Sequence, residues 1–137
     1  MSHPRTLTRA LPLAATALAA TLALTACSGN RADIDAACDS IHSQMPAVDL
    51  AAAGIDQDVL VDDIPYNDEH RAVLEDHRDD VRLLEEAARG LLREDAAERF
   101  DAVDAVIWEL DHGDEVGLAD ALDREADTQD LILVACD

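Results

Sequence analysis

The chain has 137 residues, with 31 Asp and Glu against 10 basic residues, and a formal net charge of −21 at pH 7. A charge of this sign argues against nucleic acid and anionic lipid headgroups as partners; solubility, divalent ions or a cationic protein partner remain as explanations. A single Phe, Tyr and Trp leave a core of Leu, Val, Ile and Ala, and the length suits one small domain.

The first 26 residues are organised like an export signal. Arg5 and Arg9 make the start positive, no acidic residue precedes Asp33, and residues 10–26 contain only Ala, Leu, Thr and one proline. This apolar run is shorter than the roughly 20 residues that a membrane-spanning helix needs. We therefore expect residues 1–26 to be a signal peptide that is removed.

The residues that end this segment form a second pattern. Leu-Thr-Ala-Cys at 24–27 resembles the lipobox of bacterial lipoproteins, and the lysine-free composition rich in Ala, Asp and Arg resembles small actinobacterial lipoproteins. The resemblance implies that Cys27 is diacylated, that residues 27–30 are a short tether, and that residues 31–137 form the domain. Two acyl chains give stable anchoring, here at the extracytoplasmic face of the cell membrane. The alternative is an unmodified thiol beside an ordinary cleavage site.

The two remaining cysteines lie near the two ends of the domain. Cys38 and Cys136 belong to a chain that we expect to be exported, and disulfides persist outside the cytoplasm. We predict a Cys38–Cys136 disulfide. The alternative, a redox-active pair, lacks the Cys-x-x-Cys spacing and a basic neighbour.

Apolar residues recur at helical spacing along the domain, and strand signals are almost absent. A first helix is expected from Asn30, which can cap it, to Pro46. Residues 47–66 should then form an irregular connection, with room for one helical turn, broken by Gly54 and Pro65. Three apolar side chains of this connection are expected to pack on the bundle: Val59, Leu60 and Ile64.

A second, longer helix should begin near Asn67 and end at Gly90 or Arg93. Its apolar stripe includes two histidines and continues to the last turn. The expected inward positions are His70, Val73, Leu74, His77, Val81, Leu84, Ala88, Leu91 and Leu92.

The residues after Arg93 predict two more helices. Asp95 and Glu98 have the spacing of a capping box, so a third helix should run from there to Gly113. A fourth should begin near Asp114, with a kink or restart at Thr128. The expected inward positions are Phe100, Val103, Ile107 and Leu110 in the third helix, and Leu118, Leu122, Ala126, Ile132 and Leu133 in the fourth.

These elements predict an all-α fold, a small antiparallel bundle of three to four helices that is stapled by one disulfide. Short connections between the last three helices require that neighbours in sequence are neighbours in space. The first helix then either completes the bundle or lies across it.

Tyr66, His70 and His77 are the candidate ligand-binding residues, because both histidines lie on the apolar stripe and Tyr66 precedes His70 by four residues. The domain is similar in general plan to small exported haem-binding helical proteins of mycobacteria, in which two cysteines frame a helical domain with Tyr and His near its middle. This likeness implies haem or a divalent metal as an alternative cofactor. The structural interpretation is that both histidines belong to the core, since two helical turns separate them by about 10 Å.

Other motifs are weaker. Glu109 and His112 make one copy of the Glu-x-x-His pattern of di-iron bundles, which need two copies, and the nearest second copy starts from the shorter Asp39. Trp108 lies beside several acids and is the candidate partner-binding residue, with packing between helices as the alternative. The chain has no nucleophile elbow, zinc-protease motif or phosphate loop.

The sequence therefore favours a membrane-anchored, extracytoplasmic, non-catalytic interaction or accessory module of the cell envelope that needs no cofactor. A cationic envelope protein is its expected partner. The alternative is a lipid-anchored carrier of haem or a metal. No feature of the sequence supports an enzyme.

Overall fold

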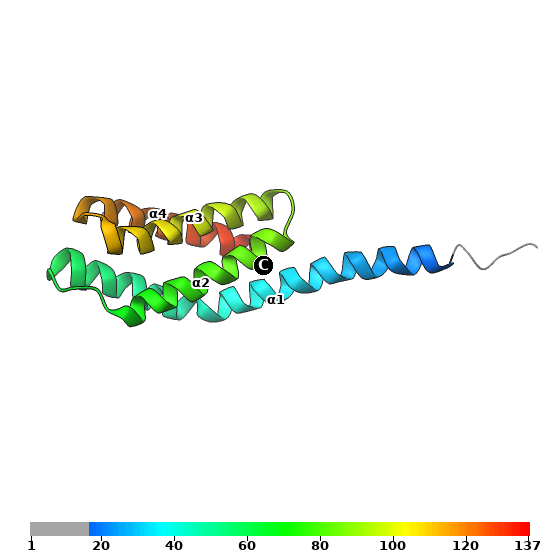
Figure 1. Cartoon of the computed structure of the whole chain (residues 1–137), viewed down its shortest axis with the longest axis horizontal. Coiled ribbons are helices and arrows are strands. Elements are labelled where there is room, and N and C mark those ends of the chain that lie inside the picture. Colours follow the sequence, from blue (N-terminus) through cyan, green and yellow to red (C-terminus); the bar gives the residue numbers. More distant parts are fainter. Residues whose placement is uncertain (1–16) are drawn as a thin grey trace, which may run out of the picture.

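A computed structural model describes the backbone from residue 17 and the side chains from residue 30, and this part of the chain is an antiparallel bundle of four helices without a strand (Figure 1). The predicted all-α bundle is confirmed. None of the described helices has both the length and the apolar character needed to cross a membrane. The elements are α1 Ala17–Ile55, the π-helical η1 Asp56–Val61, α2 Asp68–Ala87, α3 Leu91–His112 and α4 Glu115–Cys136.

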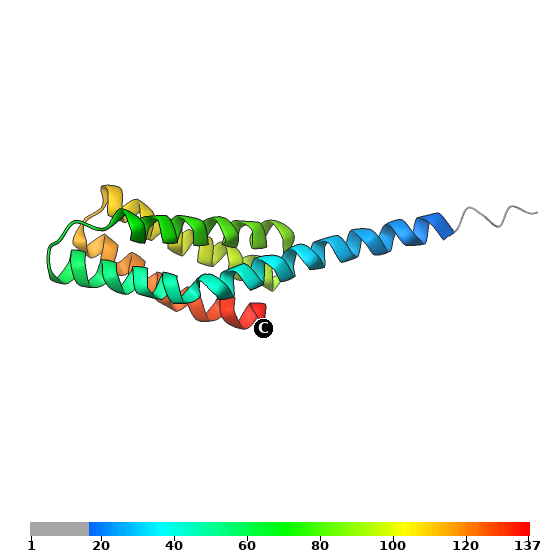
Figure 2. The same cartoon turned by 90° about the horizontal axis from the view of Figure 1, so that it is seen from below.

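The helices run alternately up and down, so that each end of the bundle collects different segments (Figure 2). The entry end is where α1 joins the bundle, and it also holds the α2–α3 connection and the C-terminus. The far end holds η1, the connection over residues 62–67 and the turn between α3 and α4.

Pro46 does not end the first helix, contrary to the prediction. A proline inside a helix costs about 3 kcal/mol relative to Ala, yet α1 continues for nine residues beyond it. Val48 and Ile55 are fully buried in that continuation, and each buried aliphatic side chain contributes about 1.5–3 kcal/mol. Burial of the second half of α1 thus outweighs the local cost.

The predicted irregular connection over 47–66 shortens to residues 62–67, because η1 continues the helical path to Val61. Val59 and Leu60 pack against the core as predicted, whereas Ile64 is exposed. Asp63 adopts a positive φ of 53°, a left-handed conformation that Asp tolerates better than most residues.

The second helix starts as predicted, with the Asn67 side chain accepting a hydrogen bond from the Glu69 amide at 2.8 Å. It ends earlier, at Ala87, and α3 begins at Leu91 rather than at Asp95. Gly90 has φ +62° and ψ −141°, a conformation that is essentially restricted to glycine. The apolar stripe that was predicted for one helix is therefore divided between α2 and α3. Leu91, which was expected to face inward, is 76% exposed.

The last two helix boundaries follow the prediction. α3 ends at His112 with Gly113 as its C-cap, and Asp114 caps α4 by accepting a hydrogen bond from the Gly117 amide at 2.8 Å. Thr128 marks neither a kink nor a restart, since α4 passes through it and Thr128 is buried. Ala126, expected inside, is exposed.

Buried positions repeat at alternating spacings of three and four residues, the pattern of coiled-coil packing. They form one apolar cluster towards the entry end, around Ile41 and Leu84, and another towards the far end, around Leu74 and Val103. A polar layer lies between the two clusters. Its members occupy core positions of the same repeat: His77, Arg99, Glu125 and Thr128.

Candidate functional site

His77, a predicted ligand-binding residue, lies in the polar layer and is fully buried. Its Nε2 accepts a hydrogen bond from Arg99 Nε at 3.2 Å, so the ring proton is on Nδ1, which lies 3.3 Å from Gln44 Oε1. Both ring nitrogens therefore have partners inside the protein. The structure supports the interpretation of His77 as a core histidine.

Arg99 crosses the interior from α3 to α4. Its Nη2 donates to Glu125 Oε1 at 2.5 Å, and its Nη1 donates to the Glu125 carbonyl and, at 3.3 Å, to Thr128 Oγ1. This pair was not predicted from the sequence, because Arg and Glu in a charge-rich helix are typical of an exposed face. The signal that could have found it is the three-four spacing of the core positions, on which both residues fall.

Burial and charge move the pKa values of the polar layer. Desolvation, followed by the positive charge of Arg99, lowers the pKa of His77 from 6.5 to about 3. Desolvation also lowers the pKa of Arg99, and the carboxylate of Glu125 opposes that effect. The layer thus holds a neutral imidazole beside an ion pair at neutral pH.

The polar layer reaches the surface through α1. Gln44 Nε2 donates to Asp80 Oδ2 at 2.6 Å, and Ser40 Oγ donates to the same oxygen at 2.5 Å. These bonds fix the amide of Gln44, whose oxygen then accepts from His77. α1 and α2 are thereby held in one register by polar contacts as well as by packing.

His70 lies half-buried against α1, apart from His77. An added Cβ at Gly54 would lie 2.5 Å from His70 Cε1, so Gly54 makes room for the imidazole. His70 Nδ1 is buried and has no hydrogen-bond partner among the described residues. A small hollow of about 250 Å³ adjoins the ring, between α1 and the first turns of α2.

Tyr66 belongs to a surface network at the far end. Its hydroxyl donates to Asp111 Oδ1 at 2.9 Å and accepts from Arg71 Nη1 at 3.4 Å, while Arg71 also pairs with Asp111. The hydrogen bonds from Tyr66 and Arg71 lower the pKa of Asp111. Tyr66, His70 and His77 therefore lie in three separate surroundings, and the structure does not bring them together into one site. In the part of the chain with described side chains, no group of three or more His, Cys, Asp and Glu residues is placed to hold a metal ion.

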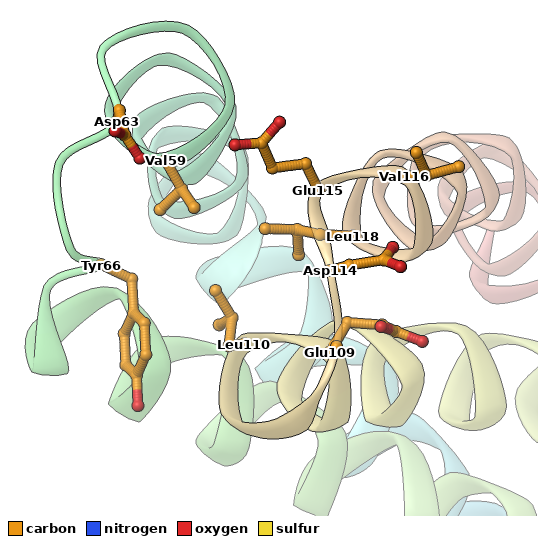
Figure 3. A pocket seen from close by; sticks show the side chains of 10 residues that line it. Val59, Asp63, Tyr66, Glu109, Leu110, Asp114, Glu115, Val116 and Leu118 are labelled. Atoms are coloured by element: carbon orange, nitrogen blue, oxygen red, sulfur yellow. The ribbon is translucent and has the colours of Figure 1, made fainter.

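A cavity of about 550 Å³ opens at the far end between the 59–66 segment, the last turn of α3 and the first turn of α4 (Figure 3). Val59, Leu110 and Leu118 gather at its centre, and Tyr66 forms one side. Carboxylates stand around this apolar floor. They belong to Asp63, Glu109, Asp114 and Glu115.

Trp108, the predicted partner-binding residue, lies next to this cavity and is 55% exposed. Its indole stacks on the imidazole of His112, with ring centroids 5.3 Å apart and planes inclined by 23°. Both rings line a second hollow of about 430 Å³, which shares Glu109, Gly113 and Asp114 with the large cavity. Trp108 does not fill the space between two helices, which was the alternative.

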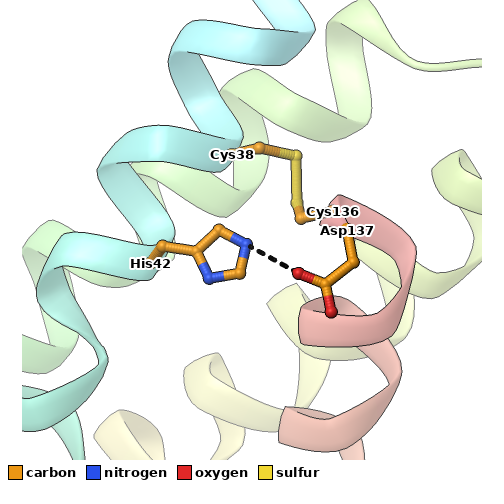
Figure 4. Close-up of a disulfide and its surroundings, with 4 residues drawn as sticks. All are labelled: Cys38, His42, Cys136 and Asp137. Atoms are coloured by element: carbon orange, nitrogen blue, oxygen red, sulfur yellow. Dashed lines mark ion pairs between the residues drawn. A yellow bond between two sulfur atoms is a disulfide. The ribbon is translucent and has the colours of Figure 1, made fainter.

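The predicted disulfide joins Cys38 of α1 to Cys136 at the end of α4, with 5.4 Å between the Cα atoms (Figure 4). His42, one turn further along α1, lies 3.9 Å from a carboxylate oxygen of Asp137. The predicted bridge is thus present, at the entry end. Cys27, the predicted lipidation site, lies outside the residues whose side chains are described.

Comparison with protein-family models, with curated proteins and with solved structures finds no match for this chain.

Proposed function

We propose that this chain is an extracytoplasmic lipoprotein, anchored to the cell membrane through Cys27, that works as a non-catalytic interaction module. The anchor is proposed from the lipobox-like sequence at 24–27. Cys27 precedes Asn30 by three residues in the sequence, and α1 joins the bundle at the entry end. The entry end would then face the membrane.

One observation carries the interaction role: the cavity of about 550 Å³ and the exposed Trp108 share the far end of the bundle. α3 has 22 residues and is about 33 Å long, so this end would be presented well away from the membrane surface. Exposed aromatic side chains beside a preformed hollow are typical of binding sites. The acidic rim favours a cationic envelope protein as the partner.

The anchor is tested by metabolic labelling with a palmitate analogue in a bacterium that processes lipoproteins. The full chain should take up the label and sediment with membranes, and Cys27→Ala should lose both properties. Cys38→Ala is the control, because it removes a cysteine of the domain and should keep the label. A Cys27→Ala chain that is still labelled would contradict the proposal.

The docking end is tested with a photo-crosslinking amino acid placed at either of two valines of α4. Val116 borders the far-end cavity and is 71% exposed, while Val134, near the other end of the same helix, is 75% exposed. Crosslinks to a cationic envelope protein should form from position 116 and be few from position 134. Equal crosslinking from both positions would contradict a specific far-end site.

A carrier of haem or a metal is the second candidate, and the buried, unpartnered Nδ1 of His70 is the observation that favours it. The test is metal content and the visible absorption spectrum of the exported domain, with and without added haem. A stoichiometric absorption band that His70→Leu removes and His42→Leu keeps would support a carrier. A colourless, metal-free and folded protein would count against one.

A further inference from the structure

Two hollows at the far end share one wall, and Glu109 lies in that wall. It lines both the large cavity and the hollow beneath Trp108. In Figure 3 the side chains of Glu109 and Asp114 extend to the same side, away from the apolar centre of the cavity. The far end thus combines an apolar hollow with an adjoining acidic one.

Two glycines make room for the Glu109 carboxylate. A Cβ added to Gly113 would lie 1.6 Å from Glu109 Oε2, and a Cβ added to Gly117 would lie 2.5 Å from the same oxygen. Gly117 lies in the first turn of α4 without a positive φ, where Ala is the more favourable helical residue. Alanine would displace the carboxylate. The absence of a Cβ at these two positions therefore leaves space for the carboxylate beside the α3–α4 turn, and at Gly117 it costs some helix propensity.

The carboxylates that line the far-end cavity form no ion pairs with other described side chains, although Asp114 accepts the capping hydrogen bond of α4. Among the described side chains, neither oxygen of Glu109 takes part in an ion pair, and the same is true of Asp63, Asp114 and Glu115. Neighbouring Asp111, by contrast, pairs with Arg71. A cluster of unpaired carboxylates beside low-dielectric walls attracts a cation.

The aromatic pair gives this cation a flat surface. His112 stacks on one side of the Trp108 indole and holds it beside Glu109. A guanidinium is planar, so it can stack on an indole and at the same time donate two parallel hydrogen bonds to a carboxylate. A lysine ammonium offers neither a stacking plane nor a fork.

We propose that Glu109 and Trp108 bind the guanidinium of an arginine side chain in a basic peptide segment of the partner. A neighbouring apolar side chain of that segment lies in the cavity over Val59, Leu110 and Leu118. Charge complementarity selects this occupant, since the rim is acidic and the floor is apolar. The inference rests on the proposed interaction role and names the chemistry that the far end recognises.

The test uses the exported, folded protein and three capped pentapeptides, with Arg, Lys or citrulline between two leucines. Trp108 is the chain's single tryptophan, so its fluorescence reports binding at this site, and calorimetry gives the affinity. The arginine peptide should bind most tightly and change the Trp108 fluorescence. Glu109→Gln should weaken its binding about tenfold, because a hydrogen-bonded charge pair is lost.

Glu98→Gln, an exposed position of the same helix, removes an equal charge and should leave the affinity within twofold. Gly117→Ala should raise the melting temperature while it weakens binding, a combination that damage to the fold cannot produce. Equal losses in Glu109→Gln and Glu98→Gln, or equal affinity for the citrulline peptide, would overturn the arginine site.

The same measurements separate this inference from the interaction role. If the arginine peptide does not bind while crosslinking still prefers position 116 over 134, the arginine site is wrong and the docking end stands. If that preference is absent as well, both are wrong.

Discussion

Arg99 is the largest fully buried side chain in the described part of the chain, larger than any buried aliphatic residue. Its guanidinium finds acceptors on His77, Glu125 and Thr128, so the charge is paired and its hydrogen bonds are made. Such a pair adds little net stability compared with a well-packed apolar core, but removing one partner leaves an uncompensated buried charge. Polar residues at core positions of a coiled coil also fix the register of the helices.

Glu125→Gln is therefore expected to lower the free energy of unfolding by about 3–5 kcal/mol. The double substitution Arg99→Met with Glu125→Leu should lower the free energy of unfolding far less, because it removes both buried charges and keeps the side-chain volume of the core. Urea unfolding followed by circular dichroism measures both. A single substitution as mild as the double one would show that the pair is not desolvated.

His77 predicts an acid sensitivity. The pKa of His77 is about 3 in the folded chain and 6.5 in the unfolded chain. Between these values the unfolded chain binds a proton at His77 that the folded chain does not, so protonation stabilises the unfolded state relative to the folded state. The contribution of the neutral His77 to the free energy of unfolding is complete above pH 6.5 and is lost as the pH falls towards 3. Between pH 7 and pH 4.5 the wild type should lose about 2–3 kcal/mol more than His77→Gln. Parallel losses in the two proteins would contradict a buried neutral imidazole.

At the scale of elements, α1 continues through Pro46 because its buried residues are distributed on both sides of the proline. Ile41 and Met45 precede it, and Val48 and Ile55 follow, all on the core side. Pro46 itself is exposed. The helix thus tolerates a missing hydrogen bond on its solvent face.

Pro46→Ala should accordingly raise the free energy of unfolding by about 1–3 kcal/mol, since it restores a helical hydrogen bond without changing the core. Pro65→Ala, in the connection between η1 and α2, is the control, and it should cause a slight loss of under about 1 kcal/mol. Thermal unfolding of the three proteins gives the comparison. A destabilised Pro46→Ala variant would mean that the proline is needed for the path of α1.

At the scale of the molecule, the disulfide ties the first helix to the last. The two cysteines are 98 residues apart in sequence and close the bundle at the entry end. Closing a loop of this length stabilises a fold by about 4–5 kcal/mol in the chain-entropy model, although measured values are often smaller. Small domains have a total stability of only about 5–15 kcal/mol.

Replacement of both cysteines by Ala should therefore remove a large share of the stability, and a reducing agent should have a similar effect on the wild type alone. The measurement is the urea midpoint of each protein with and without reductant. If the wild type keeps its midpoint after complete reduction, the loop-closure argument fails for this chain.

Much of the fold follows from local sequence. Helical periodicity is a short-range property, so the helical class, the Asn67 and Asp114 caps and the stop at Gly113 were all predicted. The disulfide could be inferred because only two cysteines remain once Cys27 is assigned to the lipid. The export signal and the anchor at Cys27 depend on sequence alone and stay predictions.

The candidate site could be predicted only in part. Trp108 was identified by its residue type and its acidic neighbours, but its stacking on His112 and the cavity beside it depend on where the α3–α4 turn meets residues 59–66. Glu109 was considered in the sequence only as part of a Glu-x-x-His metal pattern. In the structure its carboxylate lies against Gly113 and Gly117 and forms no ion pair with another described side chain.

The tertiary structure alone decided the continuation of α1 beyond Pro46, the separate start of α3 at Leu91 and the burial of Arg99 with Glu125. For Pro46 in α1 and for Arg99 with Glu125, residues on other helices overrule a local preference, whereas the separate start of α3 follows from the backbone conformation of Gly90. A proline or a buried charge is unfavourable by itself and becomes acceptable only when distant residues supply burial or a counterion. The sequence pattern indicates the local preference of each residue, but only the packed bundle shows which distant residue becomes its partner.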